Sequence, residues 1–165
     1  MRRRLLLSLS PVLALGACGF RLRGAPDMVF QSIYVTAAEN SSLGNELKRN
    51  LTSLGTVQVI ADVSRKPQAQ AILDVLSESR EKTVVGVNAS GQVREFQLRL
   101  RVNFRLNTPQ GVELIPVTEL LLQRDISFNE SAVLAKEAEE ALLYRDMQTD
   151  IVQQLMRRLA AVKSI

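Results

Sequence analysis

Hydrophobic and polar residues alternate strictly over one stretch near the middle of the chain. Apolar residues occupy every second position from Phe96 to Leu106, and charged or amide side chains fill the positions between them. Successive side chains of a β-strand point to opposite faces, so this pattern predicts a strand with one buried face. At about 3.3 Å per residue, a strand from Glu95 to Asn107 would be roughly 40 Å long.

Two further stretches have the spacing of amphipathic helices. In the first, four leucines recur between Leu43 and Leu54, with capping side chains at Asn40–Ser42 before them and Gly55 after them. In the second, the sequence from Ser131 onward contains no Gly or Pro and predicts a helix of up to about 30 residues. Its apolar ladder at i, i+4 spacing consists of Leu143, Met147, Ile151, Leu155 and Leu159.

The remaining segments predict strands and turns. Residues 30–37 and 114–128 are rich in β-forming residues, and Pro116 favours an edge position or a bulge in the second of them. Residues 69–85 predict a strand that bends or bulges at its polar middle, Ser77–Lys82. The shorter segments predict a short strand at 56–60, a loop at 62–68, and hairpin turns at 88–91 and 107–111.

In this order the elements predict an α+β fold. We expect a two-layer sandwich with the order β-α-β-β-β-α, in which a mostly antiparallel sheet of three or four strands is covered on one face by two helices. Phe96 and Phe104 lie on the apolar face and are expected in the core. Tyr34 and Tyr144 are left free to reach a surface.

The N-terminus has the pattern of a secretory signal. Arg2–Arg4 precede a short apolar run, which ends in the sequence Leu-Gly-Ala-Cys-Gly at residues 15–19. The run is shorter than the roughly 20 residues that a spanning helix needs. The Cys after small residues resembles the bacterial lipobox, which implies cleavage after residue 17 and acylation of Cys18. We therefore expect a signal peptide at 1–17, a lipidated tether at 18–27 and one domain at 28–165.

Composition excludes several kinds of chemistry. The chain has no His, and Cys18 is its only cysteine, so His-dependent triads and His- or Cys-ligated metals are ruled out once Cys18 is acylated. Three of the 21 basic residues and none of the 17 acidic ones precede Cys18, which leaves a net charge of +1 on the mature chain. Nucleic-acid binding thus loses its electrostatic support. We expect no metal, no cofactor and no enzymatic activity.

The polar face of the long strand carries three arginines, Arg99, Arg101 and Arg105. One interpretation is a solvated outer face, since charged residues also discourage edge pairing. The other is a local positive field that meets an anionic or polar partner, because the guanidinium fork binds two oxygens at once. Lys136 stands at the start of the last helix, where a cation is mildly unfavourable.

Several short motifs together resemble the LPS-assembly lipoprotein family, LptE. They are Phe20–Arg23 directly after Cys18-Gly19, the helix at 43–55, the hairpin sequence at 91–96, and Ala132–Glu137. The resemblance implies an outer-membrane lipoprotein on the periplasmic side. Such a protein inserts into the β-barrel translocon LptD as plug and assembly factor, and binds lipopolysaccharide in transit.

The resemblance also implies the binding residues. Lys136 matches a basic lipopolysaccharide contact at the start of the C-terminal helix. A second basic contact aligns with Asn88–Ser90, which are uncharged here, and Arg94 is the nearest substitute. Two other classes stay open: a structural or peptidoglycan-associated envelope lipoprotein that does not bind lipopolysaccharide, and a periplasmic hydrolase that uses two carboxylates.

Overall fold

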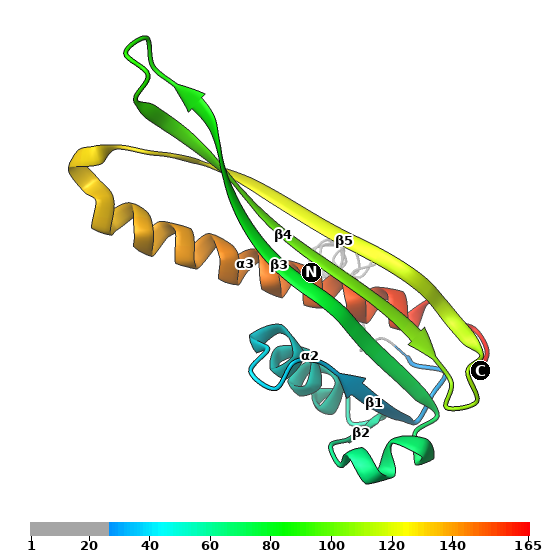
Figure 1. Ribbon diagram of the computed structural model, residues 1–165. Helices are drawn as coiled ribbons and strands as arrows, with labels where there is room; N and C mark the ends of the chain where they lie inside the picture. Colours follow the sequence, from blue (N-terminus) through cyan, green and yellow to red (C-terminus); the bar gives the residue numbers. More distant parts are fainter. Residues whose placement is uncertain (1–26) are drawn as a thin grey trace, which may run out of the picture.

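A computed structural model describes residues 27–165, which fold into one mixed sheet and two main helices (Figure 1). The sheet has the strand order β2-β1-β3-β4-β5. The elements in chain order are β1 (Ser32–Thr36), α2 (Ser42–Ser53), β2 (Gln58–Ile60), the 3-10 helix η1 (Val63–Gln68), β3 (Ala71–Val87), β4 (Val93–Asn107), β5 (Glu113–Ser127), the 3-10 turn η2 (Glu130–Ala132) and α3 (Val133–Ala160).

The predicted α+β sandwich is confirmed, with two differences in detail. The sheet has five strands rather than three or four, because β2 pairs in parallel with β1, which in turn pairs in parallel with β3. Residues 63–68 form a 3-10 helix where a loop was expected, and the side chain of Asp62 caps it by accepting from the backbone N–H of Ser64. The three long strands form the expected antiparallel meander.

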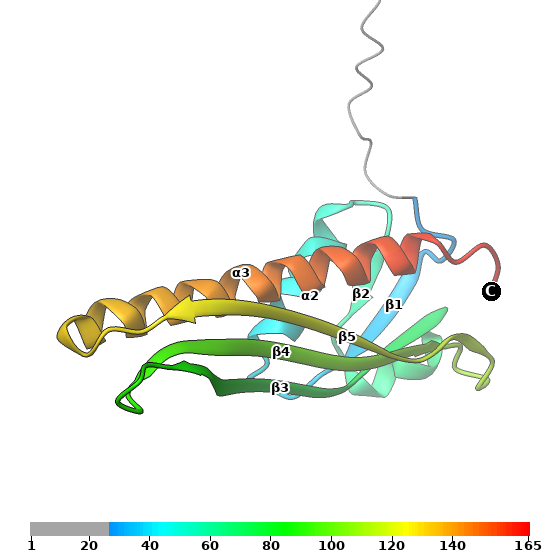
Figure 2. The same cartoon turned by 90° about the horizontal axis from the view of Figure 1, so that it is seen from above.

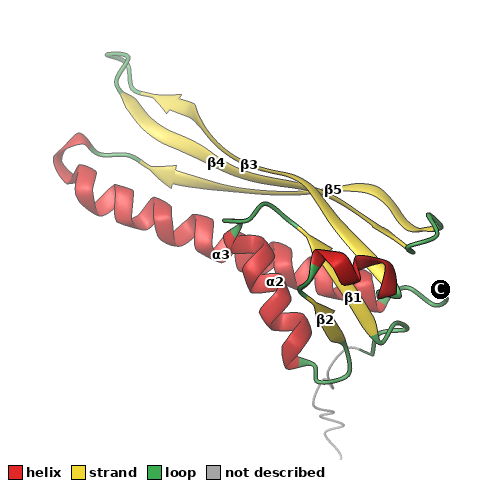
Figure 3. Ribbon diagram, turned by 60° about the horizontal axis from the view of Figure 1, so that its bottom comes forward, coloured by secondary structure: helices red, strands yellow, loops and turns green. Residues whose placement is uncertain are grey.

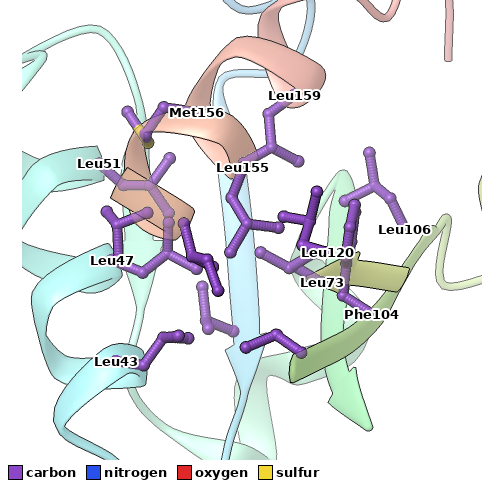
Figure 4. Packing of buried hydrophobic residues seen from close by; sticks show 14 of the residues in the cluster. Leu43, Leu47, Leu51, Leu73, Phe104, Leu106, Leu120, Leu155, Met156 and Leu159 are labelled. Carbon is purple, nitrogen blue, oxygen red and sulfur yellow. The ribbon is translucent and has the colours of Figure 1, made fainter. Parts of the chain in front are cut away.

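Both helices cover the same face of the sheet (Figure 2). Their apolar stripes meet the inward side chains of the strands in one continuous core (Figure 4). Leu47 and Leu51 of α2, Leu155 of α3 and Phe104 of β4 are all fully buried there. This burial explains why the leucine spacing predicts the helices correctly, since each stripe faces the sheet. Across residues 27–165, no helix is both long and apolar enough to cross a membrane.

A bulge at Leu76 shifts the alternation of β3. Val75 pairs with Phe104 of β4, but the next pair is Ser77 with Asn103, which leaves Leu76 outside the register and 48% exposed. From the bulge to Val84, the even-numbered residues of β3 face the helices and the odd-numbered residues face away. The expected irregularity therefore lies just before the polar segment 77–82 rather than within it.

The ends of the long strands follow the predicted turn chemistry. The carbonyl of Asn88 accepts from the N–H of Gly91, which has a φ of +80° that glycine adopts without steric cost. Pro116 lies on β5, which is an edge strand as expected, and an irregular register occurs beside it between Phe104 and Leu106 of β4.

Two aromatic residues differ from expectation. Phe96 is only partly buried, because it packs at the margin of the core rather than within it. Tyr144 is 7% exposed and belongs to the core cluster, since α3 turns its ring against β3. Phe104 is fully buried, as predicted.

Candidate functional site

A cavity of about 240 Å³ lies where the first turns of α3 meet the ends of β4 and β5. The β3–β4 hairpin diverges from α3 toward its tip in this part of the molecule (Figures 1 and 3). The apolar part of the lining consists of Phe96, Ile126, Phe128 and Val133, and the polar part of Lys82, Ser127, Lys136, Glu137 and Glu140. The cavity is thus amphiphilic, with an aromatic wall beside two ammonium groups.

The aromatic wall has a defined geometry. The rings of Phe96 and Phe128 meet edge to face, with their centroids 5.2 Å apart and their planes at 81°. The N–H of Phe128 donates a 2.7 Å hydrogen bond to the carbonyl of Arg94, which fixes the segment after β5 against the start of β4. Edge-to-face pairs are a favourable arrangement for phenyl rings, so each ring stabilises the position of the other.

Lys136 comes from the first turn of α3, where the sequence places it. The 3-10 turn η2 precedes it directly, and Asn129 caps η2 by accepting from the N–H of Ser131. The ammonium group of Lys136 lies 3.1 Å from the hydroxyl of Ser127 and 2.8 Å from a carboxylate oxygen of Glu139. Glu139 thereby offsets the unfavourable position of a cation near a helix N-terminus.

Lys82 is the second cation of the cavity. It belongs to β3 beyond the Leu76 bulge, on the side of the sheet that faces the helices. Its ammonium group lies 2.6 Å from a carboxylate oxygen of Glu140 on α3 and 4.4 Å from the centroid of the Phe96 ring. The two lysines of the cavity are therefore more than fifty residues apart in sequence, and each contacts a carboxylate of α3.

Arg94, the other predicted binding residue, has a different environment. Its guanidinium lies 3.4 Å from the amide oxygen of Gln92 and is exposed, and the cavity lining does not include its side chain. The uncharged loop before it is occupied in closing the turn, because the side chain of Asn88 accepts from the N–H groups of Ser90 and Gln92. The structure thus brings Lys136 together with Lys82 rather than with Arg94.

A more open hollow continues from the cavity along α3. Arg80, Lys82, Glu140 and Tyr144 are among its lining residues. The Arg80 guanidinium carbon lies 5.4 Å from the centroid of the Tyr144 ring. Burial, followed by the negative charge of Glu140, raises the pKa of the Tyr144 hydroxyl. The groove between β3 and α3 therefore contains both charges and aromatic surface over more than one turn of the helix.

The outer face of the sheet carries the three predicted interface arginines, and carboxylates offset much of their charge. The guanidinium of Arg101 lies 2.7 Å from a carboxylate oxygen of Glu119 and 3.8 Å from one of Glu81. The hydrogen bond to Glu119 raises the pKa of the Arg101 guanidinium. Arg105 lies 3.1 Å from Asp74, and Arg99 donates to the amide oxygen of Gln97 at 2.8 Å. This mixed pattern departs from the positive field that the β4 sequence alone suggests.

Lipidation of Cys18 falls outside residues 27–165, so the structure does not describe it. Within the described range there is no group of three or more Asp, Glu, His or Cys side chains placed to hold a metal ion. Sequence reasoning missed Lys82, Glu140 and Phe128 as site residues. The sequence shows that Arg80 and Lys82 share one face of β3. Whether that face lies toward the helices depends on the bulge at Leu76, which the sequence does not reveal.

Residues 27–165 form a small α+β domain with one polar sheet face and an amphiphilic cavity beside the first turns of its long helix. Comparison with known sequences is more specific: the chain belongs to the LptE family, described as lipopolysaccharide-assembly, whose profile matches residues 30–159. This membership confirms the predicted resemblance and gives the chain a role in lipopolysaccharide assembly.

Individual relatives agree with this assignment. The LPS-assembly lipoprotein LptE of Photorhabdus laumondii is 31% identical over 170 residues, which cover 98% of this chain and 88% of the relative. The LptE of Pectobacterium atrosepticum is 28% identical over 167 residues, with the same coverage of 98% and 88%. The solution NMR structure of lipoprotein B from Nitrosomonas europaea has a TM-score of 0.73 at 36% identity, covering 87% of this chain and 91% of that one.

Proposed function

We propose that this chain is an outer-membrane lipoprotein that forms a complex with the β-barrel lipopolysaccharide translocon of the LptD type. In that complex it serves as plug and assembly factor, and it binds lipopolysaccharide on the way to the cell surface without catalysing a reaction. The observation that carries the binding part of the proposal is the amphiphilic cavity around Lys136. Family membership supports the rest.

The cavity chemistry suits a phosphorylated glycolipid. Phosphate oxygens form strong charge-assisted hydrogen bonds with ammonium groups such as that of Lys136. Acyl chains find an apolar counterpart in Phe96 and Phe128, whose burial against hydrocarbon is favourable. Arg94, whose side chain lies outside the cavity lining, adds an exposed guanidinium on β4 two residues before Phe96. The cavity therefore offers cations to the phosphate groups of a glycolipid and aromatic surface to its acyl chains.

The outer sheet face suits the interior of a barrel. Outer-membrane barrels have polar lumens, which charged and amide side chains meet better than apolar ones do. Arg99, Arg101 and Arg105 supply such a surface along β4, and the carboxylates of Glu119 and Asp74 offset the charges of Arg101 and Arg105. Acylated Cys18 supplies the membrane attachment, since each buried CH₂ contributes about 0.8 kcal/mol.

Binding of purified lipopolysaccharide to the isolated domain tests the central claim. Lys136→Asp, alone and together with Arg94→Asp, should weaken binding while leaving the midpoint of thermal unfolding close to that of the parent protein. Lys163→Asp is the matched control, because Lys163 is exposed beyond the end of α3. Unchanged affinity in the double variant would refute the site.

The barrel partnership has its own test. Tagged protein purified from outer membranes should recover a large β-barrel protein in stoichiometric amount. If no barrel is recovered and the protein instead binds isolated murein sacculi, the peptidoglycan-associated alternative is correct. The purification from outer membranes uses the full-length chain expressed in cells, so the predicted anchor is included.

A further inference from the structure

The amphiphilic cavity contains two ammonium groups, and only Lys136 has been assigned to ligand binding so far. Lys82 lines the same cavity from β3 and stands over the Phe96 ring at 4.4 Å. The bulge at Leu76 is what turns Lys82 toward α3, since it moves the even-numbered residues of β3 to the helix side. Lys82 is therefore held at the cavity by backbone register as well as by its side-chain contacts.

Both lysines are engaged by carboxylates of the same helix. Lys82 lies 2.6 Å from Glu140, and Lys136 lies 2.8 Å from Glu139. These pairs are partly open to solvent: the side chains of Lys82 and Glu140 are 37% and 24% exposed, and those of Lys136 and Glu139 are 22% and 49% exposed. Ion pairs with this much exposure contribute little net free energy, so a stronger anion can replace one partner.

A phosphate group is such an anion. It offers several acceptor oxygens and more than one negative charge, so it can accept from two ammonium groups at once. Glu140 and Glu137, which also line the cavity, disfavour a phosphate there by like-charge repulsion. The carboxylates on the cavity wall therefore limit the affinity for phosphate, which favours release of a ligand that is bound only during transport.

We propose that Lys82 is a second phosphate-binding residue of this cavity, and that Glu140 competes with the phosphate for it. This inference rests on the proposed function, because it concerns the same ligand. Phosphate binding exchanges the Lys82–Glu140 ion pair for a Lys82–phosphate contact and frees the Glu140 carboxylate toward the open hollow beside Tyr144. No covalent bond changes in this exchange.

Four variants of the full domain test the exchange by their dissociation constants for purified lipopolysaccharide. Because charge-assisted hydrogen bonds are strong but this one is partly exposed, Lys82→Gln should weaken binding by about 5- to 20-fold, whereas Lys82→Arg should retain most of it. Glu140→Gln removes the carboxylate that competes for Lys82, so it should tighten binding by about threefold. The double variant Lys82→Gln/Glu140→Gln keeps the net charge of the cavity but lacks the ammonium group, and should bind several-fold more weakly than the parent.

The double variant separates a direct contact from a general field effect. If only the summed charge mattered, it would bind as the parent does, and the inference would be wrong. Arg124→Gln and Asp150→Asn are the matched controls, because this 3.4 Å ion pair also joins the sheet to α3 but lies outside the cavity lining. Both controls should leave affinity unchanged.

A ligand comparison identifies the group that Lys82 contacts. Enzymatically dephosphorylated lipopolysaccharide should bind the parent and Lys82→Gln equally, and an undiminished difference between them would overturn the inference. Inorganic phosphate at millimolar concentration should compete weakly with lipopolysaccharide if the phosphate is bound as part of the lipid, and complete competition would assign the site to free phosphate instead.

Loss of binding in Lys136→Asp with none in Lys82→Gln would refute only the role of Lys82, whereas a parent protein that does not bind lipopolysaccharide would refute the proposed function itself.

Discussion

The hydroxyl of Tyr144 donates a 2.7 Å hydrogen bond to the backbone carbonyl of Glu81, and so ties the middle of α3 to β3. This contact lies next to the cavity, because Glu140, one turn before Tyr144, holds Lys82 one residue beyond Glu81. One hydrogen bond and one ion pair thus join the helix to β3 beside the cavity, in addition to the packing of the core. It follows that cavity shape and local stability are linked at this point.

Replacing Tyr144 by Phe should therefore destabilise the domain by about 1 kcal/mol at neutral pH, the usual net value of one partly buried hydrogen bond. Urea denaturation followed by circular dichroism measures this directly. A change of the urea midpoint smaller than experimental error would show that the hydrogen bond makes no net contribution.

The same variant should alter the pH dependence of stability in alkali. Burial and the Glu140 charge raise the pKa of Tyr144 above its ordinary value of 10.0, so the folded protein keeps this proton at a pH where the unfolded chain loses it. The stability that this raised pKa contributes is fully present below pH 10.0, the ordinary pKa, and is lost as the pH rises through the pKa of the folded state. The parent should thus lose stability more steeply than Tyr144→Phe above about pH 10, where an unperturbed phenol ionises. Parallel curves for the two proteins would contradict this account.

Gly44 is needed for the close approach of α2 to the end of β1. A Cβ atom at position 44 would lie 2.6 Å from the Cβ of Ala37, which is a short and rigid neighbour. Gly44→Ala should therefore destabilise by about 1–3 kcal/mol, as overpacking does, although the same change in an open helix is favourable. Asn45→Ala, at the exposed next position of α2, should be neutral or stabilising, and Ala37→Gly combined with Gly44→Ala should recover most of the loss. Failure of that recovery would mean that the cost has another origin.

Much of the fold could be predicted because its signals are local. The alternation along β4 and the ladder of α3 each report on one element and one buried face, and both are borne out by Leu100 and Ile151, which are fully buried. The parallel pairing of β1 with β3 is not local, since it depends on which strand reaches which edge after α2 has crossed the sheet. β2 has only three residues, Gln58–Ile60, which is too short a pattern to show that this strand pairs with β1 at the edge of the sheet.

The site was harder to predict than the fold. Lys136 was accessible through family resemblance and its place at the start of a helix. Lys82 was not, because continuing the alternation from Leu73 and Val75 assigns the wrong face to residues 77–84. The partner of Lys82 is also 58 residues away in sequence, on a helix whose packing is set by the core. A bulge and a long-range contact must both be known before these side chains can be placed together.

The predicted anchor gives a test that is independent of the domain. Cys18→Ala should leave an uncleaved or mislocalised precursor, because acylation of the thiol precedes cleavage in lipoprotein processing as the lipobox resemblance implies. The domain at 28–165 should unfold at the same temperature as the parent domain, since its core begins at Phe30. Mass spectrometry of the purified chain measures processing, sedimentation with outer membranes measures location, and thermal unfolding followed by circular dichroism measures the stability of the domain. Normal processing and sedimentation of this variant would refute the anchor.

The outer sheet face should be the main surface that meets the barrel, and in-cell crosslinking tests it. A photoreactive residue at position 99, 101 or 105 should form a crosslink to a large outer-membrane protein, because these side chains share one face of β4. Gln153, exposed on α3, is the comparison position on the helical layer. Equal or higher yield from position 153 would show that the helices, and not the sheet, face the partner.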